Sequence, residues 1–159
     1  MQMHLPRFHC RPARHGLQKG VAAVEFAIVA VLFFTLLLGI MEFGRWLFLL
    51  NGANEATRLG ARLGVVCSIE ADTDFTRIKA RMSQMTGGGI PASRMVLEYE
   101  PAGCNIDTCT TVTARIVGAQ FAPVSPFFGL PFPIPQFPTS LPREYMNSAG
   151  NSVCPAPPA

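Results

Sequence analysis

A glycine, a long apolar run and one carboxylate form the pattern in this chain that most directly implies chemistry. Lys19 and Gly20 end a basic N-terminal stretch, Val21 begins the apolar run, and Glu25 is the fifth residue after Gly20. A carboxylate inside an apolar membrane segment costs about 3 kcal/mol, so we expect Glu25 to have a partner or a function. The spacing indicates a proteolytic processing site after Gly20.

The stretch that precedes the apolar run is basic. It contains Arg7, Arg11, Arg14 and Lys19 and no acidic residue, and the rest of the chain has nine basic and ten acidic residues. Nucleic-acid binding needs Lys and Arg clustered on one face, so we expect no nucleic-acid partner. Cations ahead of an apolar span hold that end of a chain in the cytoplasm. Everything after the span is therefore expected outside the cytoplasm.

The apolar run has the length of a membrane-spanning helix. Residues 21–41 contain Glu25 as their only charged side chain. Such a helix rises about 1.5 Å per residue and covers about 30 Å, the thickness of the hydrocarbon core. Glu42, Arg45 and Trp46 follow, an acid and a base on one helix face and an indole suited to the headgroup layer. No proline interrupts residues 47–64, so we expect the helix to continue past the membrane to about residue 66.

Small residues recur every four positions in the part of this helix beyond the membrane. They are Gly52, Ala56, Gly60 and Gly64, and a row of this kind lets another backbone approach closely. Each glycine costs about 1 kcal/mol relative to alanine in a helix, so a compensating contact is expected. We interpret the row as a packing face; the alternative is a frayed helix end. Charged residues lie elsewhere on the extension, at Glu55, Arg58 and Arg62.

Four of the five cysteines follow the span. Cys10 precedes it, whereas Cys67, Cys104, Cys109 and Cys154 lie in the part expected to be exported. An even number of cysteines in an oxidising compartment predicts two disulfides. Three pairings are possible, and the short interval favours Cys104 with Cys109, which leaves Cys67 for Cys154. Free buried thiols are the alternative, and the spacing disfavours a four-cysteine zinc site.

The region after the span alternates between a helical and a strand pattern. A short amphipathic helix is expected after Asp72 or Thr73 and before the glycines at 87–89. Its apolar face would consist of Phe75, Ile78, Met82 and Met85. Residues 95–100 and 111–117 are rich in strand-forming residues and predict a hairpin whose loop contains the two close cysteines.

The C-terminal third contains seven prolines and five phenylalanines between residues 121 and 142. This composition predicts extended coil packed on the domain. An edge strand is expected near residues 140–146. The fold class is therefore α+β, with a basic leader at 1–20, a transmembrane and extended helix at 21–66, a disulfide-stapled extracytoplasmic head with a short helix and a β-hairpin or small antiparallel sheet at 67–154, and a flexible tail at 155–159.

Residues for catalysis or metal binding are sparse. His4, His9 and His15 all lie in the leader, so a chain that starts at Val21 has no imidazole. The carboxylate pairs, Asp72 with Asp74 and Glu98 with Glu100, are expected on the surface, and the glycines at 87–89 lack the lysine of a phosphate-binding loop. We expect no enzyme activity, no cofactor and no metal.

The processing pattern resembles a known family. Gly20, Val21 and Glu25 are similar to the type IV pilin site that a prepilin peptidase cleaves. More narrowly, residues 20–27, 39–45 and 56–62 resemble the TadE-like family of tight-adherence (Tad, or Flp) pilus systems, with Ala30 where family members often have a proline. The likeness covers residues 19 to about 66.

This resemblance implies a minor pilin or pseudopilin that is cleaved after Gly20 and takes part in assembly of an adhesion pilus. The small-residue face of the helix would then carry contacts between subunits. Its implied partners are the prepilin peptidase, other pilins or pseudopilins, inner-membrane Tad assembly proteins and the lipid bilayer. The protein would lie in the bacterial inner membrane with a periplasmic head and, after processing, in the extracellular pilus. Rival interpretations are an uncleaved single-pass scaffold, a protein with an ordinary signal peptide, and an exported enzyme.

Overall fold

The computed structural model describes residues 18–69, 75–124, 129, 131–144, 146–148, 150 and 154. The basic leader up to residue 17, with Cys10 and the three histidines, lies outside these residues, as do Asp72, Thr73, Asp74 and the tail at 155–159. The chain divides into two compact units, Met1–Ile40 and Met41–Ala159. Residues 41–66 thus form one unit with the head.

The first unit contains the beginning of helix α1, which spans Gln18–Val66 without interruption. The helix starts two residues before Gly20, slightly earlier than expected. Nearly all side chains from Val21 to Ile40 are exposed, and α1 is long and apolar enough to cross a membrane by its length and composition. The expected long apolar helix and its extension are therefore present as one continuous helix.

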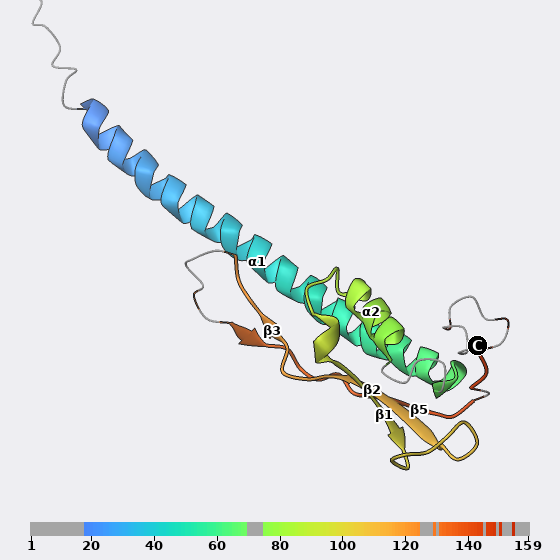
Figure 1. The fold of residues 1–159 in the computed structure, drawn as a ribbon. Coiled ribbons are helices and arrows are strands. Elements are labelled where there is room, and N and C mark those ends of the chain that lie inside the picture. Colours follow the sequence, from blue (N-terminus) through green and yellow to red (C-terminus); the bar gives the residue numbers. More distant parts are fainter. Residues whose placement is uncertain are drawn as a thin grey trace, which may run out of the picture. The chain divides into compact units, whose positions relative to one another are not determined.

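The second unit combines the rest of α1 with a second helix, α2, at Thr76–Met85. Figure 1 shows α2 alongside this part of α1. Ile78 and Met82 of α2 are buried, as expected. Met85 is exposed instead, because it lies in the last helical turn and meets α1 with its backbone carbonyl. The residue that immediately precedes α2 is Phe75.

A three-stranded antiparallel sheet has the order β1-β2-β5. Its strands are β1, Met95–Glu100; β2, Thr111–Ile116; and β5, Thr139–Pro142. The predicted hairpin is confirmed with Met95 opposite Ile116 and Glu100 opposite Thr111. The expected edge strand is also present, one residue earlier at its start and shorter at its end, and it pairs with β2.

The proline-rich segment is mainly coil, as predicted, but it also contains a short two-stranded pairing that was not predicted. Strand β3, Gln120–Phe121, pairs with β4, Phe132–Pro133. A 3-10 turn at Ala92–Arg94 leads into β1.

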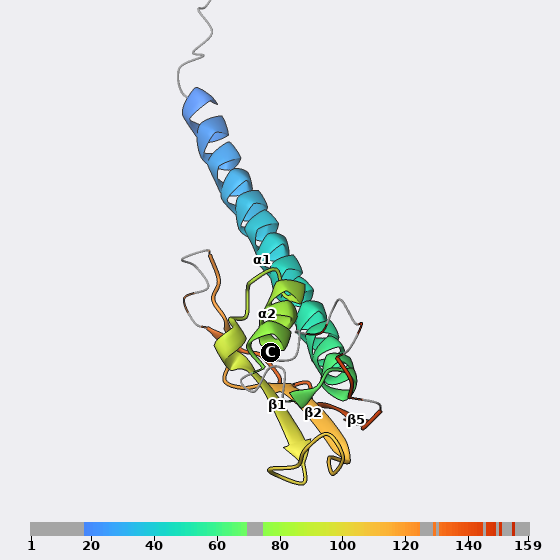
Figure 2. The same cartoon turned by 45° about the vertical axis from the view of Figure 1, so that its right-hand side comes forward.

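One face of the sheet forms the core together with the two helices. Along β2, Val112, Ala114 and Ile116 are fully buried, and they alternate with partly exposed residues. Met95 and Leu97 of β1 lie on the same inner face. Figure 2 shows the sheet beside the end of α1. The buried residues of β1 and β2 alternate with more exposed ones, so one face of the sheet packs against the second half of α1 and against α2.

Candidate functional site

The processing motif lies in the exposed part of α1. Gly20 has no heavy atom within 4 Å of the position where a Cβ would lie, and the side chains of Val21 and Glu25 are exposed. No partner for the Glu25 carboxylate is found among the residues that the structure describes in this unit. Within the described residues of this unit, the side chains of the motif are therefore exposed.

The row of small residues is a close packing face, but the chain's own head covers it. A Cβ added at Gly60 would lie 2.5 Å from Met82 Sδ, and one at Gly64 would lie 2.7 Å from Val112 Cγ1. Ala56 is fully buried. The row is thus a packing face, and α2 and the sheet of the same chain occupy it. The expected contacts between subunits would have to use other faces of α1.

At Gly52 the neighbour is the backbone of α2. A Cβ at this position would lie 2.9 Å from the carbonyl oxygen of Met85 and 3.2 Å from Thr86 Cα. Backbone atoms cannot avoid a clash by a change of rotamer, as a side chain can. Glycine is therefore what allows the C-terminal end of α2 to approach α1 this closely.

Hydrogen bonds fix the sheet against the same part of α1. The Tyr99 hydroxyl donates to the carbonyl oxygen of Gly64 at 3.2 Å, and the hydroxyls of Thr57 and Thr139 share a hydrogen bond of 3.1 Å. Thr57 is fully buried, so its polar group needs such a partner. Strands β1 and β5 are thus both attached to the helix. Sequence reasoning missed the role of Thr57, because its partner Thr139 lies 82 residues later in the chain.

The four cysteines after the span form two disulfides. Cys67 is bonded to Cys154 and Cys104 to Cys109, which is the pairing that the spacing favoured. The first bond joins the residue that follows α1 to the C-terminal region, 87 residues later in the chain. The second closes the loop between β1 and β2.

Charged residues gather where the second unit begins. Arg45 Nη1 lies 2.9 Å from Glu42 Oε2, and the Arg45 guanidinium lies 5.4 Å from the centre of the Phe121 ring. The other Glu42 oxygen accepts a hydrogen bond from the backbone N–H of Val124 at 2.8 Å. The pairing of Glu42 with Arg45 was expected from their spacing, whereas their contacts with the segment 120–124 were not.

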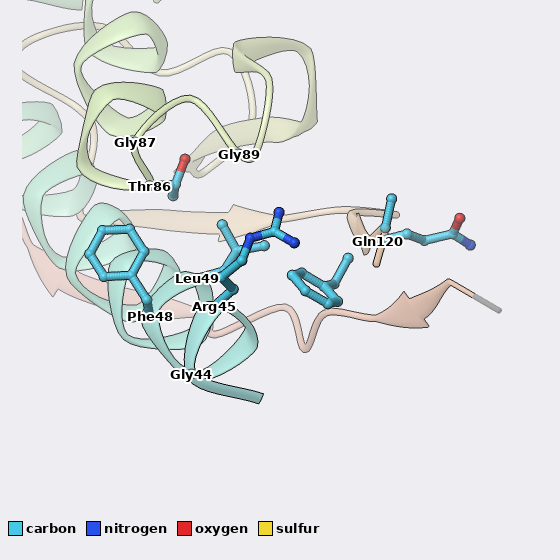
Figure 3. Close-up of a pocket in the computed structure, with 10 residues that line it drawn as sticks. Gly44, Arg45, Phe48, Leu49, Thr86, Gly87, Gly89 and Gln120 are labelled. Carbon is cyan, nitrogen blue, oxygen red and sulfur yellow. The ribbon is translucent and has the colours of Figure 1, made fainter. Parts of the chain in front are cut away.

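An open hollow of about 530 Å³ borders Arg45. Figure 3 shows the Arg45 side chain extending from α1 between the turn after α2 and strand β3. Apolar side chains of α1 and polar groups of the other two segments line the hollow: Phe48, Leu49, Thr86 and Gln120. Within the described ranges, no group of three metal-ligating side chains comes together.

The comparison with protein families finds a match to the N-terminal part of the chain. The family described as TadE-like protein matches residues 20–62, which include Gly20, Val21, Glu25 and three of the four small residues. The comparisons with curated proteins and with solved structures give no match. The family match and the apolar helix support a membrane protein associated with the Tad pilus. Over residues 20–62, about a quarter of its length, this chain is similar to the TadE-like family.

Proposed function

We propose that this chain is a minor pilin or pseudopilin that takes part in assembly of a Tad (Flp) type IVb adhesion pilus after a prepilin peptidase cleaves it behind Gly20. The observation that carries the proposal is the exposed Glu25 carboxylate, the only charge of the apolar run and the fifth residue after Gly20. In this proposal the chain acts by assembly and not by catalysis.

Glu25 would act through the new amino terminus of a neighbouring subunit. Cleavage after Gly20 creates an ammonium group on Val21, and a carboxylate in an apolar environment needs a charge of opposite sign. The two groups on different chains would neutralise each other and set the stagger of adjacent helices. The exposed apolar side chains between Val21 and Ile40 would then pack between subunits.

The proposed location follows from the same segment. The four basic residues of the leader would hold the N-terminus in the cytoplasm, the helix would cross the inner membrane once, and the head would lie in the periplasm. Two disulfides in the head support an oxidising compartment. After processing, the subunit would enter the pilus or prime its assembly at the inner membrane with the Tad assembly proteins.

An uncleaved membrane scaffold of the same machinery is the second candidate. The observation that favours it is the start of α1 at Gln18, which puts the bond between Gly20 and Val21 inside the helix. A peptidase would have to unwind the first turn to reach this bond. A scaffold would keep residues 1–20 and would have no free ammonium on Val21.

The intact mass and N-terminal sequence of the membrane-extracted protein separate the two candidates. We expect a chain that starts at Val21 in cells with a prepilin peptidase and the full leader in cells without it. The substitution Gly20→Val should block cleavage. Gly44→Val is the matched control, because Gly44 is also a glycine of α1 with no heavy atom within 4 Å of its Cβ position. A full leader in cells with the peptidase would refute processing and support the scaffold.

A further inference from the structure

The longest uncharged segment of the head leaves apolar side chains in contact with solvent. Residues 116–142 contain no Asp, Glu, Lys or Arg. In the described part of this segment, Val124 is 75% exposed and Phe132 is 46% exposed. Single exposed apolar residues are ordinary on a protein surface. A group of them next to an apolar helix indicates an interaction surface.

This segment is attached to α1 at the first turn of the second unit. The Val124 N–H donates to Glu42, and Phe121 lies under the Arg45 guanidinium. Phe132 is the direct partner of Phe121 in the pairing of β3 with β4. Val124 and Phe132 are therefore held close to residues 42–45 of the helix.

The same turn of α1 exposes apolar side chains of its own. Phe43, Leu47 and Phe48 are all exposed, although they belong to the unit that contains the head. They follow directly after the apolar run that ends at Met41. Residues 42–48 rise about 10 Å along the helix, which is enough to cross one headgroup layer of about 5 to 8 Å.

We propose that Phe43, Leu47, Phe48, Val124 and Phe132 form a collar that inserts into the headgroup layer of the bilayer on the side of the head. The collar is continuous with the apolar run, and aromatic side chains favour this layer. Arg45, which is about half exposed, would contact lipid phosphates. The head then meets the membrane through its proline-rich segment as well as through α1. The inference rests on insertion of residues 21–41 in the proposed function, but it does not depend on cleavage.

A fluorophore that reports its environment can measure the depth of the collar. The full chain with Cys10→Ser would carry single labelled cysteines at Val124→Cys or Phe132→Cys, prepared without reductant so that both disulfides stay closed. It would be reconstituted in vesicles of phosphatidylethanolamine and phosphatidylglycerol with nitroxide groups near the headgroups. Trp46, the only tryptophan, reports insertion of the helix itself.

Arg81→Cys is the matched control. Arg81 is an exposed residue of α2 whose neighbour Met82 packs at Gly60. Gly60 is 18 residues beyond Glu42, or about 27 Å along the helix. A label at position 81 should therefore stay in water.

We expect the labels at 124 and 132 to emit at shorter wavelength and to lose intensity to the nitroxides, while the label at 81 does neither. Labels at 124 and 132 that behave like the label at 81, with Trp46 quenched, would overturn the collar but leave membrane insertion standing. An unquenched Trp46 would overturn both. Labels shielded in native membranes but not in lipid vesicles would show that a protein covers the surface, which also contradicts the proposal.

Discussion

The two halves of helix α1 place opposite kinds of residues in opposite environments. Between Val21 and Ile40 the large apolar side chains are exposed, with Phe26 at 75%. Between Leu49 and Val66 most of the small residues are buried, and Ala53, Ala56 and Ala61 have no exposed surface. One continuous helix is thus exposed on all sides in its first half, whereas one of its faces is tightly covered in its second half.

The difference shows how the surroundings of a helix determine which residues it uses. Large apolar side chains can stay exposed where lipid or other apolar helices replace water. Small side chains are needed where α2 and the sheet must come close to the backbone of α1, as at Gly52 and Gly64. The first half is therefore suited to contacts with lipid or with other subunits. The second half is already occupied by its own head.

The largest effect is expected from opening the disulfide that closes the packed half. The double substitution Cys67→Ser and Cys154→Ser should lower the free energy of unfolding of the head by about 4 kcal/mol, because the bond closes a long loop. The matched variant, Cys104→Ser with Cys109→Ser, removes a disulfide between cysteines only five residues apart. It should lower the free energy of unfolding by about 2 kcal/mol.

Urea unfolding of the full chain in detergent, followed by near-ultraviolet circular dichroism, measures both disulfide variants. The helical signal of the exposed half should persist after the head unfolds, since residues 21–40 do not depend on packing against it. Equal losses in the two variants would show that loop length does not determine the contribution of these bonds. Loss of all helical signal with the head would contradict the contrast between the two halves.

A smaller effect is expected from adding one methyl group to α1 at a packed position and at an open one. Gly52→Ala should destabilise the head by about 1 to 3 kcal/mol, because the new Cβ meets the carbonyl oxygen of Met85 at 2.9 Å. Gly44→Ala, eight residues earlier in open space, should be neutral or stabilising by up to about 1 kcal/mol. The midpoint of thermal unfolding in detergent reports both. A stabilising Gly52→Ala would show that α2 can move away from α1 without cost.

Local patterns in the sequence predicted the elements of the head well. Strands β1 and β2 follow from strand-forming residues with alternating apolar side chains, and the short interval between Cys104 and Cys109 favours a bond between them. The apolar run and the absence of proline predicted the uninterrupted helix α1. In each case the information lies in neighbouring residues, so a single sequence is sufficient.

Contacts between distant segments were not predictable in the same way. The four-residue repeat of small side chains indicated that something packs closely on α1, but it contained no information on whether another subunit or the chain's own α2 does so. The hydrogen bond between Glu42 and Val124 joins residues 82 positions apart. The pairing of β3 with β4 involves only two residues on each strand, which is too short for a strand pattern to be recognised.

The smallest effect on folding is expected from Glu25, although its effect on assembly should be large. Glu25→Ala lies in the first unit and should change the free energy of unfolding of the head by less than about 0.5 kcal/mol. Cleavage after Gly20 should continue, because the glycine is intact. Piliation should be lost, because the substitution removes the carboxylate that is proposed to pair with the Val21 ammonium of a neighbouring subunit.

Glu55→Ala is the matched control for this prediction in the covered half of the helix. Glu55 is an exposed carboxylate whose oxygen lies 3.5 Å from Arg58, and a surface pair of this kind contributes less than about 1 kcal/mol. Electron microscopy of cells with each variant, together with the N-terminal mass of the extracted protein, measures both outcomes. Normal piliation with Glu25→Ala would exclude the pairing with Val21. Loss of piliation with both variants would mean that carboxylates in either half of α1 serve assembly, and the functional contrast between the halves would then fail even though the structural one remains.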